Sequence, residues 1–279
     1  MIDTLKIGLF LMAAIPLSYG HAAETDLYRT SVIVTGQGKT NRELGFKECF
    51  DRIVARVTGD PRLSSRAETE PFREDAGRLV ASFSYRDRMG GIPIHDEQGT
   101  YDRPHDLTCV FDPATLDPVL KQLGSRPWIS QRLPISVFLL VERGTDRTVL
   151  LEGTSKGADM RESFAAAART MAMEVRFPAK GELDIETWRL LAEPDSQRAA
   201  RSTNRYVTGT ASLIGRLVWS EDDLGWVVAW TLPYDDQYYR WQVRGINFDE
   251  AFRVAVRGVA QILSGNGEPE QSSTAPPKP

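Results

Sequence analysis

Residues 135–142 read ISVFLLVE, an apolar run of strand length with Ser136 as its one polar residue before Glu142. A strand with a solvated face alternates apolar and polar side chains, whereas a strand covered on both faces is apolar nearly throughout. The run therefore predicts a central strand with other layers packed on both faces of its sheet. Such a sheet is typical of α/β proteins, with an α+β arrangement as the alternative. The length of 279 residues and the 41% hydrophobic content allow two units of this kind.

The second unit is expected over residues 127–264. After the central strand, RTVLLE forms another strand, and helices are expected over the Ala-rich residues 159–173, in IETWRLLA and in DSQRAARST. RYVTGTASLIGRLVW, GWVVAWTLP and YYRWQVRG then read as an antiparallel meander. NFDEAFRVAVRGVAQIL closes the unit as an amphipathic helix capped by Asn247 and Glu250. We expect a mixed sheet whose C-terminal meander packs under helices, followed by a disordered tail over residues 265–279.

The first unit is expected over residues 24–126. YRTSVIVTG is an apolar, β-branched strand, and the segment after it has the spacing of a helix. Thr40 is the expected N-terminal cap of this helix, and Gly59 is expected to end it. A further strand is expected over residues 107–111, where apolar residues alternate.

Two prolines bear on the helix in DPATLDPVLKQLG, which follows that strand. Pro113 suits a first helical turn, because the backbone N–H that proline lacks has no partner there. Pro118 lies further in, where it removes a helical hydrogen bond. We therefore expect the helix to begin at Asp117-Pro118 or to be preceded by a short turn.

Residues 1–23 have the layout of a secretory signal peptide, with Lys6, the apolar run of residues 7–17 and small residues near Ala22. The apolar run is well short of the roughly 20 residues that span a bilayer as a helix. We expect cleavage and a periplasmic or secreted mature protein, with an uncleaved anchor as the alternative. Later apolar runs are too short to predict a transmembrane segment in the mature chain.

The two cysteines are expected to face one core. Cys49 belongs to the apolar face of the first long helix, and Cys109 shares a strand face with Leu107 and Phe111. Export would allow a disulfide between them, and closing a loop of about 60 residues would stabilise the fold by roughly 4 kcal/mol. The alternative is a pair of buried free thiols that pack as small apolar side chains.

A serine motif raises the question of catalysis. GTSKG, residues 153–157, fits the G-x-S-x-G pattern and places Ser155 between a strand and a helix. A hydrolase of that type needs a histidine after the serine, whereas all three histidines precede it. A flexible loop is the favoured interpretation of the motif, with Lys156 or Lys180 left as alternative bases.

A polar loop supplies weak metal candidates. His95 and His105 lie among aspartates and a glutamate, which are ligand-type side chains. Their spacing matches no compact metal motif, so the loop is interpreted as a solvated one. We expect no metal and no cofactor.

Aromatic side chains are concentrated in the last three strands. Alternation places Trp226 and Trp230 on one strand face, and aromatic surfaces are favoured in recognition. The favoured interpretation is a core packed under the closing helix, with a binding surface as the alternative. The candidate binding residues are Trp219, Trp226, Trp230, Tyr238 and Trp241.

The charge balance argues against nucleic acid as a partner. The chain has 34 Lys and Arg against 38 Asp and Glu, a net charge of −4, whereas nucleic-acid-binding domains carry a basic excess. The sequence therefore predicts a non-catalytic protein-interaction or assembly module of the cell envelope, with an envelope protein as its partner. The alternatives are a small-molecule or glycan-binding protein and an envelope hydrolase using Ser155 or a metal loop at His95 and His105.

Several segments carry a family resemblance when taken in order. They are YRTSVIVTG with ECFDRIVARVTGDPRL, then DLTCVFDPATLDPVLKQLGSRPWISQRLPISVFLLVE, then RYVTGTASLIGRLVW with GWVVAWTL. Over residues 27–263 the chain resembles the bacterial exported family labelled domain of unknown function 2066. This resemblance implies an exported α/β protein. It implies no catalytic residue, because that family has no established activity.

Overall fold

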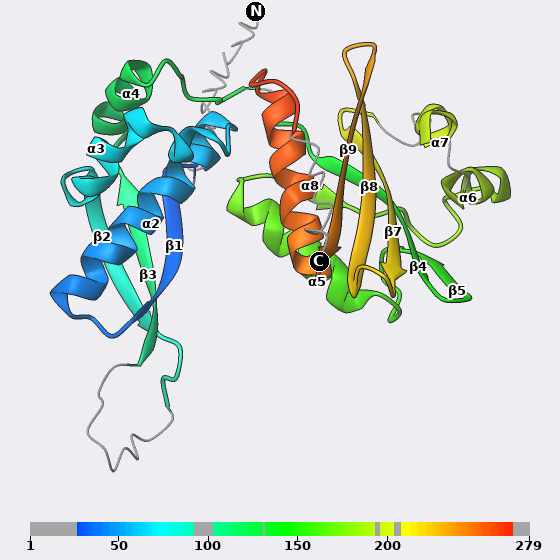
Figure 1. The fold of residues 1–279 in the computed structure, drawn as a ribbon, viewed down its shortest axis with the longest axis horizontal. Coiled ribbons are helices and arrows are strands. Elements are labelled where there is room, and N and C mark those ends of the chain that lie inside the picture. The colour runs from blue at the N-terminus through cyan, green and yellow to red at the C-terminus, as the bar shows by residue number, and fades with distance from the viewer. Residues whose placement is uncertain (1–26, 92–102, 131, 193–195, 204–207, 270–279) are drawn as a thin grey trace, which may run out of the picture.

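The computed structural model describes residues 27–91, 103–130, 132–192, 196–203 and 208–269. They form one sheet of three strands and one of six (Figure 1). Helices pack on both sheets, which confirms the α/β class. In chain order the elements are β1 (Arg29–Thr35), α2 (Lys39–Thr58), α3 (Glu70–Glu74), β2 (Val80–Asp87), β3 (Pro104–Phe111), α4 (Pro113–Gln122), β4 (Ile135–Arg143), β5 (Asp146–Val149), α5 (Ala158–Thr170), β6 (Val175–Arg176), α6 (Ile185–Ala192), α7 (Ser196–Thr203), β7 (Ala211–Ser220), β8 (Gly225–Tyr234), β9 (Gln237–Ile246) and α8 (Phe248–Leu263).

The three-stranded sheet is antiparallel in the order β1-β3-β2, and α2 packs across one of its faces (Figure 1). Alternation decides which side chains meet α2: Val32 and Val34 of β1 and Leu107 of β3 are buried there. On the opposite, outer face, the hydroxyls of Ser31 and Thr108 are hydrogen-bonded at 2.7 Å. The sheet therefore has one packed and one solvated face.

The long helix α2 differs from the prediction at its start and agrees with it at its end. It begins at Lys39 after Gly38, and no side chain caps it, so the prediction of Thr40 as the cap is wrong. Thr40 already lies inside the first turn, because the helix starts two residues earlier than the hydroxyl pattern indicated. Gly59 ends the helix as predicted, with φ of 76°.

Helix α4 begins earlier than the prolines predicted. The carboxylate of Asp112 accepts a hydrogen bond from the backbone N–H of Ala114, and Pro113 occupies the first turn. Pro118 lies inside the helix, so the predicted start at Asp117-Pro118 is wrong. The cap and the burial of the apolar side of α4 outweigh one missing backbone hydrogen bond.

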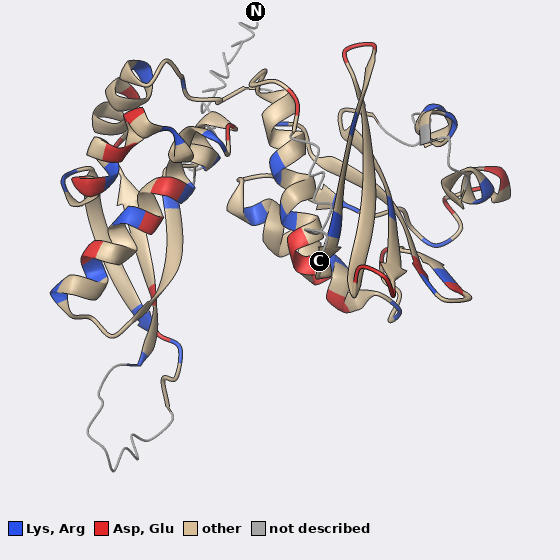
Figure 2. Cartoon of the chain, in the orientation of Figure 1, with Lys and Arg blue, Asp and Glu red and all other residues tan. Residues whose placement is uncertain are grey.

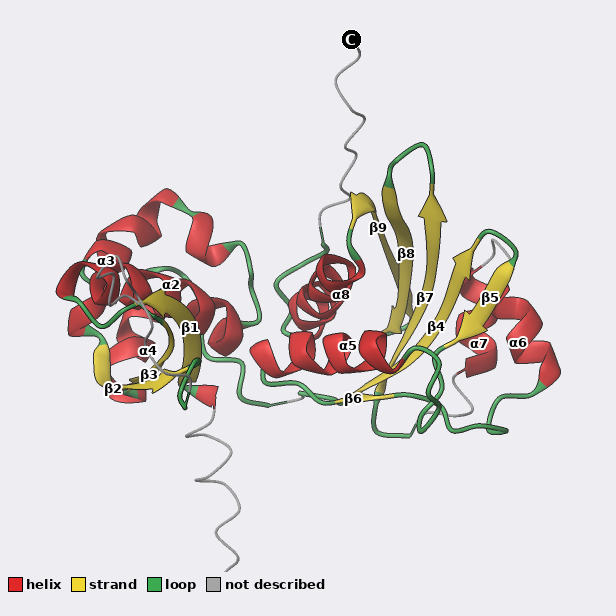
Figure 3. Ribbon diagram, turned by 90° about the horizontal axis from the view of Figure 1, so that it is seen from below, coloured by secondary structure: helices red, strands yellow, loops and turns green. Residues whose placement is uncertain are grey.

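The six-stranded sheet has the order β5-β4-β7-β8-β9, with β6 also paired to β4. The β4 pairings with β6 and β7 are parallel and the others antiparallel, so the predicted mixed sheet and its meander are confirmed. We call the side that packs on α5 and α8 the inner face and the side that packs on α6 and α7 the outer face (Figure 3). Leu139 of β4 points to the inner core and Leu140 to the outer core, which confirms the strand covered on both faces.

The C-terminal end of the described chain packs back on α8. The side chain of Asn247 caps α8 by accepting from the N–H of Glu250, as predicted. The strand expected from Arg205 begins only at Ala211, and residues 208–210 form a bend before it. After α8, the side-chain amide of Gln261 donates to the carbonyl of Glu268 at 2.8 Å.

Candidate interaction surface

The aromatic side chains predicted as a binding surface lie on both faces of the six-stranded sheet. Trp230 and Trp241 are direct neighbours on β8 and β9 and are 1% and 2% exposed in the inner core. Trp226 is also buried there, and Trp219 is half-buried at its edge. Tyr238 packs with the outer core instead. The five residues therefore form no common surface, and binding by the half-buried Trp219 and Tyr238 stays a prediction.

The position of Trp230 is set by shape rather than by hydrogen bonding. Its ring meets that of Phe164 from α5 edge to face, with the ring centres 6.0 Å apart. Gly215 on β7 leaves space for the indole, since a Cβ there would lie 2.2 Å from it. The indole N–H groups of Trp230 and Trp241 have no partner among the described residues. These two side chains therefore pack as apolar volume.

Ser155 lies on an exposed turn between β5 and α5. The neighbouring Lys156 donates to both carboxylate oxygens of Asp146, at 2.7 and 2.9 Å, so its ammonium group is already paired. His105 belongs to β3 in the other sheet. Within the described part of the chain, the structure does not bring Ser155 together with a histidine base.

His105 lies in the strand β3, which begins at Pro104, and not in the predicted loop. Its contacts there are structural. It is buried, and the side-chain amide of Gln37 donates to its Nε2 at 3.1 Å while its Nδ1 donates to the carbonyl of Arg103 at 2.8 Å. His95, the other candidate ligand, lies outside the described residues. Among the residues that are described, no group of three His, Cys, Asp or Glu side chains could hold a metal ion.

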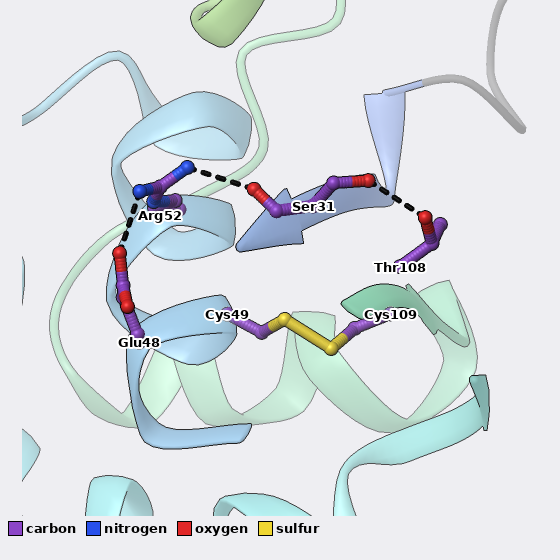
Figure 4. Close-up of a disulfide and its surroundings, with 6 residues drawn as sticks. All are labelled: Ser31, Glu48, Cys49, Arg52, Thr108 and Cys109. Carbon is purple, nitrogen blue, oxygen red and sulfur yellow. Dashed lines mark hydrogen bonds and ion pairs between the residues drawn. A yellow bond between two sulfur atoms is a disulfide. The ribbon is translucent and has the colours of Figure 1, made fainter. Parts of the chain in front are cut away.

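The two cysteines form a disulfide, as the sequence predicted (Figure 4). It joins Cys49 of α2 to Cys109 of β3, which are 60 residues apart. On the same helix, Arg52 donates to the carbonyl of Ser31 in β1 at 2.7 Å. Together these contacts fix α2 to two of the three strands.

A pair of arginines joins the three-stranded and six-stranded parts of the chain. Arg56, buried near the end of α2, donates from Nη1 to the carbonyl of Arg169 at the end of α5 at 2.6 Å. Arg132, in the connector before β4, donates from Nη1 to the carbonyl of Met171 and from Nη2 to that of Arg56, at 2.7 and 2.6 Å. The carbonyls at helix C-termini favour cations, so both guanidinium groups suit these positions.

Burial lowers the pKa of Arg132. Desolvation, and then the neighbouring charge of Arg56, lower its pKa to about 10. The group remains charged at neutral pH, and the ring of Trp128 lies 4.2 Å beneath it in a cation–π contact. The junction therefore contains two charged groups whose partners are backbone carbonyls and an aromatic face.

A cavity of about 550 Å³ lies beside this junction, where the C-terminal ends of α2, α4 and α8 meet. Its polar groups already hold the chain together: the side-chain amide of Asn266 donates to the carbonyl of Thr58 at 3.0 Å, and Arg62 donates to the carbonyl of Asn266 at 2.5 Å. We therefore assign this cavity to the junction and not to a ligand.

The outer face of the six-stranded sheet is only partly covered. α6 packs on β4 and β7, α7 packs on β7 and β8, and both stop short of β9 (Figures 1 and 3). The part left open, which we call the outer face of β7–β9, is formed by alternate side chains of the meander. They are the half-buried Arg216 and Val218 and the exposed Ala229, Arg240 and Gln242.

Sequence reasoning missed both the junction and this open face. Alternation along YYRWQVRG separates Arg240 and Gln242 from the buried Trp241 and Val243, which is a usable signal. The helices that cover the neighbouring strands come from earlier in the chain. Which part of the face they leave open depends on strand order, which alternation does not give.

Comparison with known proteins gives one match over part of the chain and no function. Residues 22–129 match the model of a family described as Domain of unknown function (DUF8605). This match agrees with the expectation of an uncharacterised domain. The expected family, domain of unknown function 2066, was wrong, because the matching model is that of a different family. No curated protein and no solved structure matches the chain. In the described residues, the longest helices are too short or too polar to cross a membrane.

Proposed function

We propose that the chain is an exported protein that works in the cell envelope as a non-catalytic protein-interaction module. The observation that carries this proposal is the outer face of β7–β9, which is exposed on a sheet whose central strand β4 is covered on both faces. Antiparallel strands with an open face and small residues such as Ala229 offer a flat surface to another protein.

Two features support the location outside the cytoplasm. The first is the signal-like layout of residues 1–23. The second is the disulfide between Cys49 and Cys109, since structural disulfides persist in oxidising compartments and are rare in the cytosol. Cell fractionation and N-terminal sequencing of the mature protein test this part. A cytosolic protein that retains Met1 would contradict it.

Site-specific crosslinking in living cells tests the interaction. A photoreactive residue replaces Ala229 on the open face or, as a matched control, the exposed Ser84 on the outer face of the three-stranded sheet. We expect a discrete adduct with one envelope protein from position 229 and none from position 84. The captured protein is then purified and its binding to the wild-type chain is measured directly. No adduct from position 229, or the same adducts from both positions, would contradict the proposal.

A further inference from the structure

We infer that the outer face of β7–β9 binds an acidic, extended segment of its partner protein. This inference rests on the proposed function and adds the chemistry of the partner. Its basis is a band of arginines that crosses the strands while the acidic groups lie at the strand ends.

The glutamate within this band is already neutralised. Glu142 of β4 has a side chain only 6% exposed. Its Oε1 forms an ion pair with Nε of Arg147 at 2.7 Å, and its Oε2 accepts a hydrogen bond from Nε of Arg216 at 2.5 Å. The ion-pair contact of each arginine with Glu142 is made by Nε, and among the described residues no Nη group of either arginine makes a hydrogen bond. Their side chains are 61% and 37% exposed, so these donors remain accessible to a ligand.

The band continues onto β9. Arg240 and Gln242 are exposed there, and neither has a partner within the described part of the chain. Ala229 of β8 lies between Arg216 of β7 and Gln242 of β9 and pairs with both. Its small side chain leaves space between these two longer ones. Three arginines against one glutamate give the face a surplus of positive charge, although the whole chain has a net charge of −4.

Acidic groups mark the two ends of the same strands. Asp235 and Asp236 form the tip of the β8–β9 hairpin (Figure 2). At the opposite end, Asp223 pairs with Arg244 at 3.0 Å. An acidic ligand aligned along the strands would meet the hairpin tip, so the favourable direction lies across them.

The spacing of the band suits an extended chain. Arg147 on β5 and Arg240 on β9 are four strand spacings apart, roughly 19 Å at about 4.8 Å per strand, and the register offsets them by four residues along the strands, roughly 13 Å. The band therefore runs obliquely across the strands, and its two ends lie roughly 23 Å apart. Arg216 lies on the strand midway between them. In an extended chain, which rises about 3.3 Å per residue, side chains four residues apart lie on one face and recur at about 13 Å, close to the roughly 12 Å between successive arginines of the band.

Fluorescence anisotropy with a defined probe tests the inference. The probe is a fluorescein-labelled peptide of about nine residues with Asp at every fourth position, a spacing of roughly 13 Å on one face of the extended chain. A matched peptide carries Asn in place of Asp. We expect the acidic peptide to bind, the Asn peptide to fail, and added salt to weaken binding. Equal binding of the two peptides, or binding of neither, would overturn the inference.

Charge reversal locates the site. Arg240→Glu replaces an attraction by a repulsion and should weaken binding of the acidic peptide roughly tenfold. Arg29→Glu makes the same charge change at an exposed, unpartnered arginine of the three-stranded sheet and should leave affinity unchanged. Because both positions are exposed, both variants should keep the wild-type melting temperature. Equal losses in the two variants would show non-specific charge attraction and end the proposal.

Two outcomes separate this inference from the proposed function. If the crosslink from position 229 forms but the acidic peptide does not bind, the interaction surface stands and its acidic chemistry is wrong. If the peptide binds at Arg240 but no envelope protein is captured at position 229, the chemistry stands and the proposed function fails. Vesicles with anionic lipids are a third arm: binding to them that is stronger than to the peptide and lost in Arg240→Glu would assign the face to a membrane and overturn the inference.

Discussion

The two sheets of this chain reach stability by different means. The six-stranded sheet packs Leu139 into one core and Leu140 into another, so its central strand is covered on both faces. The three-stranded sheet packs on one face only, and the Cys49–Cys109 disulfide fixes α2 to it. A small layer with one covered face buries less apolar surface, and crosslinks are a common compensation. The comparison predicts that the two parts respond to different perturbations.

The solvated faces of the two sheets also differ. On the three-stranded sheet, Ser31 bonds to Thr108, and Arg86 pairs with Asp106 at 2.5 Å, so these polar groups have partners within the sheet. On the six-stranded sheet, Arg240 and Gln242 have none among the described residues. Exposure alone therefore does not distinguish a binding surface, and neither does one unpaired charge such as Arg29; a band of basic groups with free donors does.

The largest effect is expected in the inner core of the six-stranded sheet. Trp230→Ala removes a buried indole and should lower the free energy of unfolding by about 3–5 kcal/mol. Urea unfolding followed by circular dichroism measures this change. Trp219→Ala is the matched control, because Trp219 lies half-buried at the edge of the core and its loss should cost less. Unchanged stability with a lost ligand would instead favour the aromatic binding surface.

Loss of the disulfide should destabilise the three-stranded sheet. Replacing Cys49 and Cys109 together by Ala should lower stability by about 4 kcal/mol, the chain-entropy value for a loop of roughly 60 residues. Amide hydrogen exchange should show lost protection in β1, α2 and β3. Protection in β4 and β7 should be retained. Equal losses in both sheets would contradict their separate stabilisation.

Features of the fold that depend on local sequence could be predicted, whereas those that depend on contacts between distant residues could not. Alternation placed Cys109 and Trp230 in cores correctly, because a side chain's face follows from its own strand. The start of α2 was misplaced because Thr40 offers a hydroxyl but Gly38 occupies the cap position. The contact of Arg132 with Met171 was out of reach, since hydrogen bonds to backbone carbonyls leave no residue pattern. Arg240 was visible as a residue, but its lack of a partner depends on strand order.

Coupling between the two sheets depends on the junction. Arg132→Met removes the donors to the carbonyls of Met171 and Arg56 and should cost about 2–3 kcal/mol, the range for hydrogen bonds from a charged group. Calorimetry should then show the unfolding of the two sheets as separate transitions. Arg132→Lys keeps the charge but not the planar fork of donors, so it should restore coupling only in part. A single transition at the wild-type temperature in Arg132→Met would show that the arginine does not join them.

The smallest effect concerns two carboxylates at the surface, the half-buried Asp223 and the exposed Glu74, where the two sheets should behave alike. A hydrogen bond from Arg244 lowers the pKa of Asp223 below its ordinary value of 3.8, and one from Lys47 lowers the pKa of Glu74 below 4.5. A lowered pKa in the folded state means that each pair contributes stability above the ordinary value and loses it as the pH falls through the folded-state pKa. Carboxyl NMR titration should show the pKa of Asp223 rising in Arg244→Gln and that of Glu74 rising in Lys47→Gln. If only one of them rises, local pairing is not the shared cause, and the sheets differ in electrostatics as well as in packing.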